Sequence, residues 1–209
     1  MKITDIDVQK KNKNRVSVFV DGEYSFSLEK IDALRLSLKI GMEITDADIQ
    51  KYNIESNLGK ARSKAGDMLS RRPYSSHDFK SKLLDKGFDE VIVNSVLEEF
   101  SELGYLNDLE YAKMYIEDAR LKLKGDKKIM YELSLKGIGE RITREALAEC
   151  EDVPLEDVAA IINTKYASMD ITDYKIKQKI TAYLASRGFS YSDINDAIRC
   201  AVESRENIE

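Results

Sequence analysis

The densest group of cations in the chain, residues 120–136, has the residue types that contact phosphate groups. This segment reads RLKLKGDKKIMYELSLK and holds six basic and two acidic residues. Lysine and arginine bind nucleic-acid phosphates and acidic protein faces. Because lysines two positions apart on either side of a glycine cannot share one helix face, we expect them to flank a helix–helix junction. The sequence predicts a cationic partner contact here, with an ordinary solvated surface as the alternative; the candidates are Arg120, Lys122, Lys124, Lys127 and Lys128.

A second basic group surrounds Pro73, which cannot continue a helix. Arg71 and Arg72 precede this proline, so they stand at a helix end, where they either contact a partner or complement the helix dipole. Tyr74 follows, and a tyrosine beside an arginine is a candidate for stacking on a nucleic-acid base. This group contributes the candidates Arg62, Lys64, Arg71, Arg72 and Tyr74.

Catalytic and metal-binding chemistry find little support in the sequence. His77 is the sole histidine, and neither a nucleophile nor an orienting partner accompanies it in a recognisable pattern. Cys150 and Cys200 have no companion ligands at zinc spacing. We therefore expect a protein without catalytic residues, bound metal or cofactor.

Composition narrows the class of protein further. The chain has 209 residues, of which 33 are basic and 38 acidic, so its formal net charge of −5 argues against a general nucleic-acid coat protein. No apolar run reaches the length of a membrane span, and the first residues lack the apolar core of a secretory signal. We expect a cytoplasmic, monomeric protein that does not contact membranes.

The first 45 residues predict a small β-rich unit. RVSVFV (15–20) and EYSFSL (23–28) flank Asp21-Gly22, a strong hairpin signal, and Tyr24, Phe26 and Leu28 are expected to share one face. A strand is expected before this hairpin, and a short helix after it that carries Ile31 and Leu34 at helical spacing. A unit of this size needs a neighbour to pack against.

The remainder of the chain contains an internal repeat of about 50 residues. Gly87, Gly137 and Gly188 are each preceded by apolar residues at −8 and −4 and by Lys or Arg at −1, and are followed by apolar residues at +1, +9 and +10. This pattern predicts a helix that ends at the glycine with a cation in its last turn, followed by another helix. The cations are Lys86, Lys136 and Arg187, which we interpret mainly as helix-capping residues and secondarily as partner contacts.

With a preceding helix, each repeat has three helices and too little core to stand alone. The predicted architecture is mainly α: a β-rich unit over 1–45, then three-helix repeats over 46–106 (with a lead-in helix), 107–152 and 153–209. We expect the repeats to form an elongated, curved array.

Four segments in this order resemble the RecX family of bacterial recombinase regulators: AGDMLSRRPYSSHDFKSKLLDKGF (65–88), LGYLNDLEYAKMYIEDA (103–119), KGDKKIMYELSLKGI (124–138) and KITAYLASRGFSYSDI (179–194). The resemblance implies three tandem three-helix units, no catalysis, and binding to the RecA recombinase in its filament on DNA. It further implies inhibition of recombination, ATP hydrolysis and repressor co-cleavage, and so regulation of DNA repair and the SOS response. Two alternatives stay open: a direct DNA-binding module that competes for single strands, and a generic helical-repeat scaffold.

Overall fold

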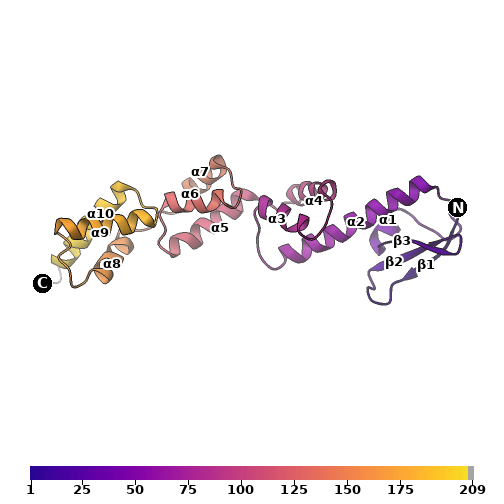
Figure 1. Cartoon of the computed structure of the whole chain (residues 1–209), viewed down its shortest axis with the longest axis horizontal. Helices are drawn as coiled ribbons and strands as arrows, with labels where there is room; N and C mark the ends of the chain where they lie inside the picture. The colour runs from indigo at the N-terminus through magenta and orange to yellow at the C-terminus, as the bar shows by residue number, and fades with distance from the viewer. Residues whose placement is uncertain (207–209) are drawn as a thin grey trace. The chain divides into compact units, whose positions relative to one another are not determined.

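A three-stranded antiparallel sheet begins the chain in the computed structural model, which describes residues 1–206 (Figure 1). Its strands are β1 (Ile3–Val8), β2 (Arg15–Val20) and β3 (Glu23–Glu29), in the order β1-β2-β3. Asp21 and Gly22 join β2 to β3 with φ values of 49° and 91°. Positive φ at both positions is what the tight hairpin turn requires, so the predicted hairpin is confirmed.

A bulge in β3 changes the face on which Tyr24 lies. Val18 pairs with Phe26, whereas the next residue, Phe19, pairs with Tyr24, so Ser25 is an extra residue in the ladder. Phe26 is buried as expected, but Tyr24 is 60% exposed and its ring packs edge-on against Phe19. The prediction that Tyr24 shares the inner face was therefore wrong, because the extra residue reverses the side-chain alternation.

The helix after the sheet is shorter than expected and presents a different face to the core. Helix α1 spans Lys30–Arg35, and its buried residues are Asp32 and Ala33. Ile31 and Leu34 are 74% and 69% exposed, so the apolar spacing expected to face the core faces solvent instead.

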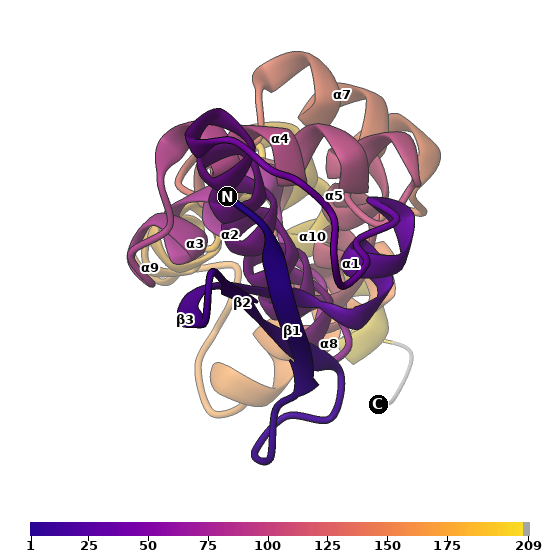
Figure 2. The same cartoon turned by 90° about the vertical axis from the view of Figure 1, so that its right-hand side faces the viewer.

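A 24-residue helix, α2 (Asp46–Leu69), supplies the neighbour that the sheet needs (Figure 2). Thr45 and Asp48 form a capping box at its start. The Tyr52 ring lies 5.1 Å from the Phe26 ring, and the buried Arg15 guanidinium donates to Glu29 of β3 and to Ser56 of α2. The expected lead-in helix and the first helix of the first repeat are thus one continuous helix.

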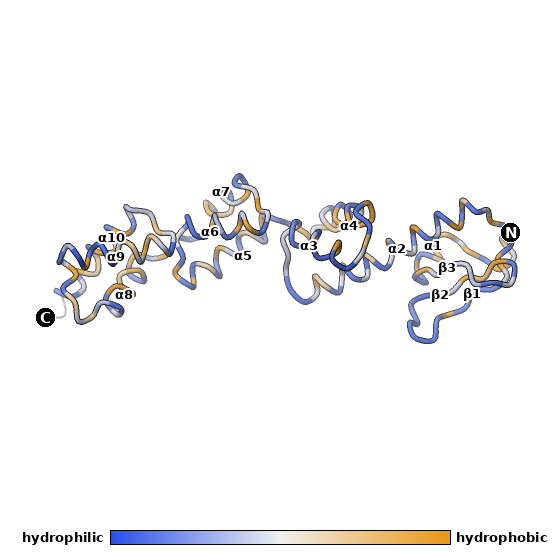
Figure 3. The backbone as a smooth tube through the Cα atoms, in the orientation of Figure 1, coloured by the Kyte–Doolittle hydropathy of each residue, from blue (hydrophilic) through white to orange (hydrophobic). Residues whose placement is uncertain are grey.

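Three sets of helices build the repeats, as expected. The helices are α3 (Ser76–Leu84), α4 (Glu90–Glu102), α5 (Asp108–Leu121), α6 (Asp126–Ser134), α7 (Glu140–Glu149), α8 (Leu155–Lys165), α9 (Tyr174–Ser186) and α10 (Tyr191–Glu206). The first repeat uses the second half of α2 with α3 and α4. The second repeat uses α5 to α7, and the third uses α8 to α10. Apolar and polar positions alternate along the helices (Figure 3).

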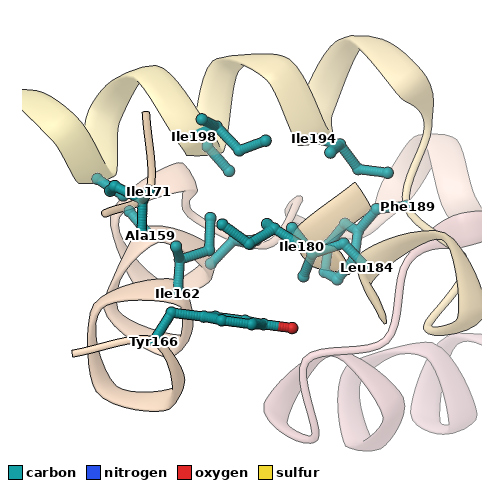
Figure 4. Close-up of a cluster of buried hydrophobic side chains, with 12 residues drawn as sticks. Ala159, Ile162, Tyr166, Ile171, Ile180, Leu184, Phe189, Ile194 and Ile198 are labelled. Carbon is teal, nitrogen blue, oxygen red and sulfur yellow. The ribbon is translucent and has the colours of Figure 1, made fainter. Parts of the chain in front are cut away.

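Each repeat has its own apolar core, built from equivalent positions. Phe79, Ile129 and Ile180, eight residues before the repeated glycine, are fully buried, as are the leucines four residues before it. In the third repeat, Ile162 of α8, Leu184 of α9 and Ile194 of α10 converge in one cluster (Figure 4). The repeated glycines have φ values of 82°, 74° and 94°, which confirms the predicted left-handed helix ends.

Two compact units make up the chain. Unit 1 comprises Met1–Tyr74 and Phe79–Leu106; unit 2 comprises Ser75–Asp78 and the described residues from Asn107 onward. The second and third repeats therefore belong to one unit. The mainly α fold of three-helix repeats is confirmed, and the elongated, curved form of the array stays a prediction.

Candidate nucleic-acid interface

A groove of about 300 Å³ in unit 1 is lined by most of the cations of the second basic group. It lies where the last turns of α2, the turn after that helix and the end of α3 meet. Its cationic lining residues are Lys64, Arg71, Arg72, Lys82 and Lys86, and the single carboxylate among its lining residues is Asp67.

Helical spacing explains why these cations converge. Lys64 and Met68 lie one turn apart on α2, and Arg71 follows the end of that helix on the same side. Lys82 and Lys86 are likewise four residues apart, at the end of α3 and just beyond it. Ser70 ends α2, and Pro73 prevents the chain from extending that helix. The chain therefore turns back and brings the two helix ends together.

The cations of this groove carry unneutralised charge. Within residues 1–206, none of its five cations lies within ion-pair distance of a carboxylate. By contrast, Arg35, Lys80 and Lys113 each hold a carboxylate at 2.9 Å or less. A group of unpaired cations beside a shallow groove attracts anions such as phosphates.

Tyr74 gives the groove an aromatic wall. The Arg72 guanidinium carbon lies 4.0 Å from the centre of the Tyr74 ring, and that ring packs edge-on against Phe79. A stacked guanidinium is held in one orientation while it still offers donors to a phosphate. The structure therefore places Arg72 on the Tyr74 ring, and the stacking of Tyr74 on a nucleic-acid base stays a prediction.

A second groove of about 480 Å³ in unit 1 shares Lys64 and Lys86 with the first and adds Lys60. We define the α2–α3 basic surface as the cations of both grooves that have no ion pair among the described residues: Lys60, Lys64, Arg71, Arg72, Lys82 and Lys86. The sequence analysis missed Lys60 and Lys82. The sequence feature that could have identified them is their spacing of four residues from Lys64 and Lys86, which places each pair of lysines on one helix face.

Arg62 does not belong to this surface. Its guanidinium Nε donates to Glu99 of α4 at 2.7 Å, and neither groove is lined by it. Arg62 follows the core residue Ala61 and turns toward α4, whereas Lys64 turns toward α3. Arg62 therefore ties α2 to α4 in the free chain, and a partner contact at this residue stays a prediction.

Arg120, from the first basic group, is also structural. It is 8% exposed, and its guanidinium donates to the Cys150 and Glu151 carbonyls and, at 2.8 Å, to the Asp152 carboxylate. A buried guanidinium with these partners cannot reach another molecule without breaking them. The place of Arg120 on the inner side of α5 turns it toward the loop after α7, so its burial argues against the predicted partner contact.

The lysines of this group have different surroundings. Lys122 pairs with Asp118 one turn earlier, and Lys124 donates to Glu132 at 2.7 Å. Lys127 and Lys128 occupy the first turn of α6, and no ion pair to either occurs in the part of the chain that the structure describes. Of this group, only Lys127 and Lys128 therefore present free cationic charge.

The repeated cations Lys136 and Arg187 act on neighbouring elements. Lys136 lies 3.8 Å from Asp78 and over the Tyr115 ring. Arg187 donates to the carbonyls of Lys122 and, at 2.9 Å, Leu123, which follow the end of α5. Arg187 was predicted to stabilise the C-terminus of its own helix, but the carbonyls to which its guanidinium donates follow α5 of the preceding repeat.

Glu132 gives unit 2 a pH-dependent network. Burial would raise the pKa of this carboxyl, but hydrogen bonds from Lys124 and Tyr115 outweigh it and hold the pKa below its usual range. Burial, together with the bond to Glu132, raises the pKa of Tyr115. A carboxyl with a lowered folded-state pKa stabilises the protein above its unfolded-state pKa, and the contribution is lost as the pH falls through the folded value.

We therefore expect Glu132→Gln to lower the free energy of unfolding at pH 7 by about 1–2 kcal/mol, since the half-buried Lys124 loses its counter-charge. The same substitution should cost progressively less as the pH falls below about 4. Urea unfolding of unit 2 at several pH values measures both. Glu145→Gln, in an exposed pair with Arg141, is the control and should change little. A pH-independent loss in the Glu132 variant would contradict the expectation.

The described residues offer no cluster for metal binding, and the Cys150 thiol is not activated. Among residues 1–206, no three His, Cys, Asp or Glu side chains are placed to hold a metal ion. Burial raises the pKa of the Cys150 thiol, which disfavours the reactive thiolate. None of the described helices is both long and apolar enough to span a membrane.

The fold and this surface define a class of protein: a three-helix-repeat protein with a group of unpaired cations on its first unit. The chain belongs to the RecX family of regulatory proteins. Residues 1–45 match the regulatory protein RecX N-terminal domain, and residues 61–100, 107–147 and 155–198 match the first, second and third RecX three-helix domains.

Individual relatives agree with this assignment. The chain is 30% identical to regulatory protein RecX of Clostridium botulinum strain Alaska E43, over 96% of each chain. It is 32% identical to that of Clostridium tetani, over 94% of this chain and 93% of the relative. A crystal structure of regulatory protein RecX superposes with a TM-score of 0.77 at 26% identity, covering 93% of this chain and 97% of that one. The structure of RecX from Lactobacillus salivarius gives 0.63 at 26% identity, over 69% of this chain and 96% of that one.

Proposed function

We propose that this chain is a non-enzymatic regulator that binds the RecA recombinase in its filament on DNA and inhibits recombination, ATP hydrolysis and co-protease activity. Through these it would modulate DNA repair and the SOS response. The observation that carries the proposal is the α2–α3 basic surface, a set of unpaired cations in a chain of the RecX family. We further propose that the protein acts as a cytoplasmic monomer.

The basic surface supports contact with a nucleoprotein filament because such a filament offers phosphates and acidic protein faces close together. Arg71 and Arg72 lie on the short turn after α2, so their guanidinium groups reach outward from a fixed helix end. Lys64 and Lys86 extend the surface over adjacent helices. A guanidinium group can donate two parallel hydrogen bonds to two oxygens of one phosphate, which fixes the orientation of the phosphate as well as adding affinity.

Lys127 and Lys128 are a second contact in this proposal. Replacing both by glutamate should weaken inhibition of the recombinase about three- to tenfold, because each of two unpaired cations contributes modestly at a rim. Titration of the recombinase ATPase with the variant measures the change. Lys175→Glu with Lys177→Glu, two exposed lysines of α9, is the matched control. Equal losses in both double variants would mean that net charge, and not this position, matters.

Competition for single-stranded DNA is the second candidate function, and the stacked Arg72–Tyr74 pair beside a cationic groove favours it. The formal net charge of −5 argues against it.

A titration separates the two functions. Inhibition at far less than one regulator per recombinase subunit supports action on the filament. Inhibition that excess DNA relieves, with an affinity for naked DNA that falls steeply with salt, supports competition and would overturn the filament proposal.

A further inference from the structure

A groove within unit 2 is lined mainly by charges of the sign opposite to those of the α2–α3 basic surface of unit 1. It has a volume of about 960 Å³ and is formed by α5, the loop from Cys150 to Pro154, α8 and Tyr183 of α9. Its apolar lining includes Leu121, Val153 and Ile161. Leu121 is 84% exposed, which is unusual for a leucine unless a partner covers it.

Carboxylates surround this apolar floor. Glu117 of α5, Glu149 of α7, Glu151 and Asp152 of the loop, and Asp157 of α8 all line the groove. Glu149 pairs with Lys113 and Asp152 with Arg120. Within residues 1–206, Glu117, Glu151 and Asp157 have no ion pair to their side chains.

The two cations among the lining residues do not neutralise these three carboxylates. Arg120 is buried and committed to the Cys150 and Glu151 carbonyls and to Asp152. Lys165 lies 3.8 Å from the centre of the Tyr183 ring, over its face. The groove therefore keeps a negative potential beside exposed apolar surface.

Arg120 also gives the groove a fixed wall. Through its bonds to three consecutive residues, 150–152, it fastens the loop between α7 and α8 to α5. Pro154 then starts α8 with its φ fixed by the ring. Because these contacts already hold the groove open in the free chain, binding of a ligand does not have to supply the free energy that forming the groove would cost.

We propose that this groove docks a basic segment of another protein, in which Lys or Arg residues flank a large apolar side chain. The apolar side chain would cover Leu121 and Ile161, and the flanking cations would face Glu117 and Asp157 across the groove. Nucleic acid does not fit, because its phosphates would meet unpaired carboxylates. The site goes beyond the proposed contact with a filament through cations, since it recognises the opposite charge on a different unit.

Binding of a synthetic peptide tests this site directly. The probe is a short fluorescent peptide in which lysines flank two adjacent leucines, and fluorescence anisotropy with the full chain measures its dissociation constant. We expect binding that weakens about tenfold between about 50 and 300 mM salt. A peptide with the leucines replaced by serine should bind at least about tenfold more weakly, since the apolar contact is lost.

Charge variants locate the binding. Glu117→Lys with Asp157→Lys should weaken binding of the leucine peptide by at least about tenfold, because two attractions become repulsions. The matched control is Glu156→Lys with Glu203→Lys, which makes the same charge change on exposed positions of α8 and α10 outside the groove. Leu121→Ser, at an exposed position, tests the apolar floor without disturbing the core.

Three results would overturn the proposal. They are no binding of the leucine peptide, equal binding of the serine peptide, or an equal loss in the control double variant. Stronger binding of single-stranded DNA than of the peptide, weakened by Leu121→Ser, would overturn the proposal and assign the groove to nucleic acid instead.

Discussion

Replacing Arg71, Arg72 and Lys86 together by glutamate is expected to raise the concentration of protein that half-inhibits the recombinase ATPase by roughly 100-fold. Each cation contributes about 1 kcal/mol to a contact with phosphates or carboxylates, and three such losses multiply to about this factor. The three residues line one groove, and the described residues supply no ion pair that the substitutions would break. Folding should therefore be preserved, and circular dichroism and thermal unfolding check this.

The control is the triple variant Lys30→Glu, Lys39→Glu, Lys51→Glu. It changes the net charge equally and uses three exposed lysines of unit 1 that line neither basic groove. We expect this control to inhibit nearly as well as the unaltered protein. Wild-type inhibition by the Arg71/Arg72/Lys86 variant would remove the α2–α3 basic surface from the mechanism. A comparable loss in both triple variants would show that the effect depends on net charge alone.

The fold was readable from the sequence wherever one local rule decided the conformation. Asp21-Gly22 requires a turn with positive φ, and the three repeated glycines follow apolar stripes at helical spacing, so the hairpin and the repeats were predicted correctly. Tyr24 was misplaced because one extra residue in a strand reverses every side chain beyond it. Ile31 and Leu34 were misplaced because a six-residue helix is oriented by its neighbours, and not by its own periodicity.

The site was harder to predict because charge alone does not show which cations are paired. Arg120 stood in the most basic segment of the chain, yet its partners are two carbonyls and a carboxylate 30–32 residues away. Arg62 likewise finds Glu99, 37 residues later. Such pairings depend on how helices pack, and they remove a cation from the surface. Lys60 and Lys82 show the converse. Only the packing of the helices shows that these two lysines line the grooves without an ion pair among the described residues.

The packing between the second and third repeats explains why one of the repeated glycines should be far less tolerant than another. Gly188 has φ +94°, and a Cβ there would overlap the backbone nitrogen and the Cβ of Lys128 and come within 2.8 Å of the Gly125 carbonyl oxygen. The Gly125 amide donates to Arg187 and the Lys127 amide to Gly188, so backbone meets backbone at this place. Neither side can yield by rotating a side chain.

Gly188→Ala is therefore expected to lower the free energy of unfolding of unit 2 by about 3 kcal/mol or more, from the left-handed φ together with the overlap. Gly87→Ala is the matched control, because Gly87 has φ +82° but a Cβ there meets nothing within 4 Å. The control should lose only about 1 kcal/mol, the cost of the backbone conformation. Hydrogen exchange at Ile129 in the second repeat and Ile180 in the third, with urea unfolding, measures the difference. Equal losses at the two glycines would mean that the repeats of unit 2 do not pack through this contact.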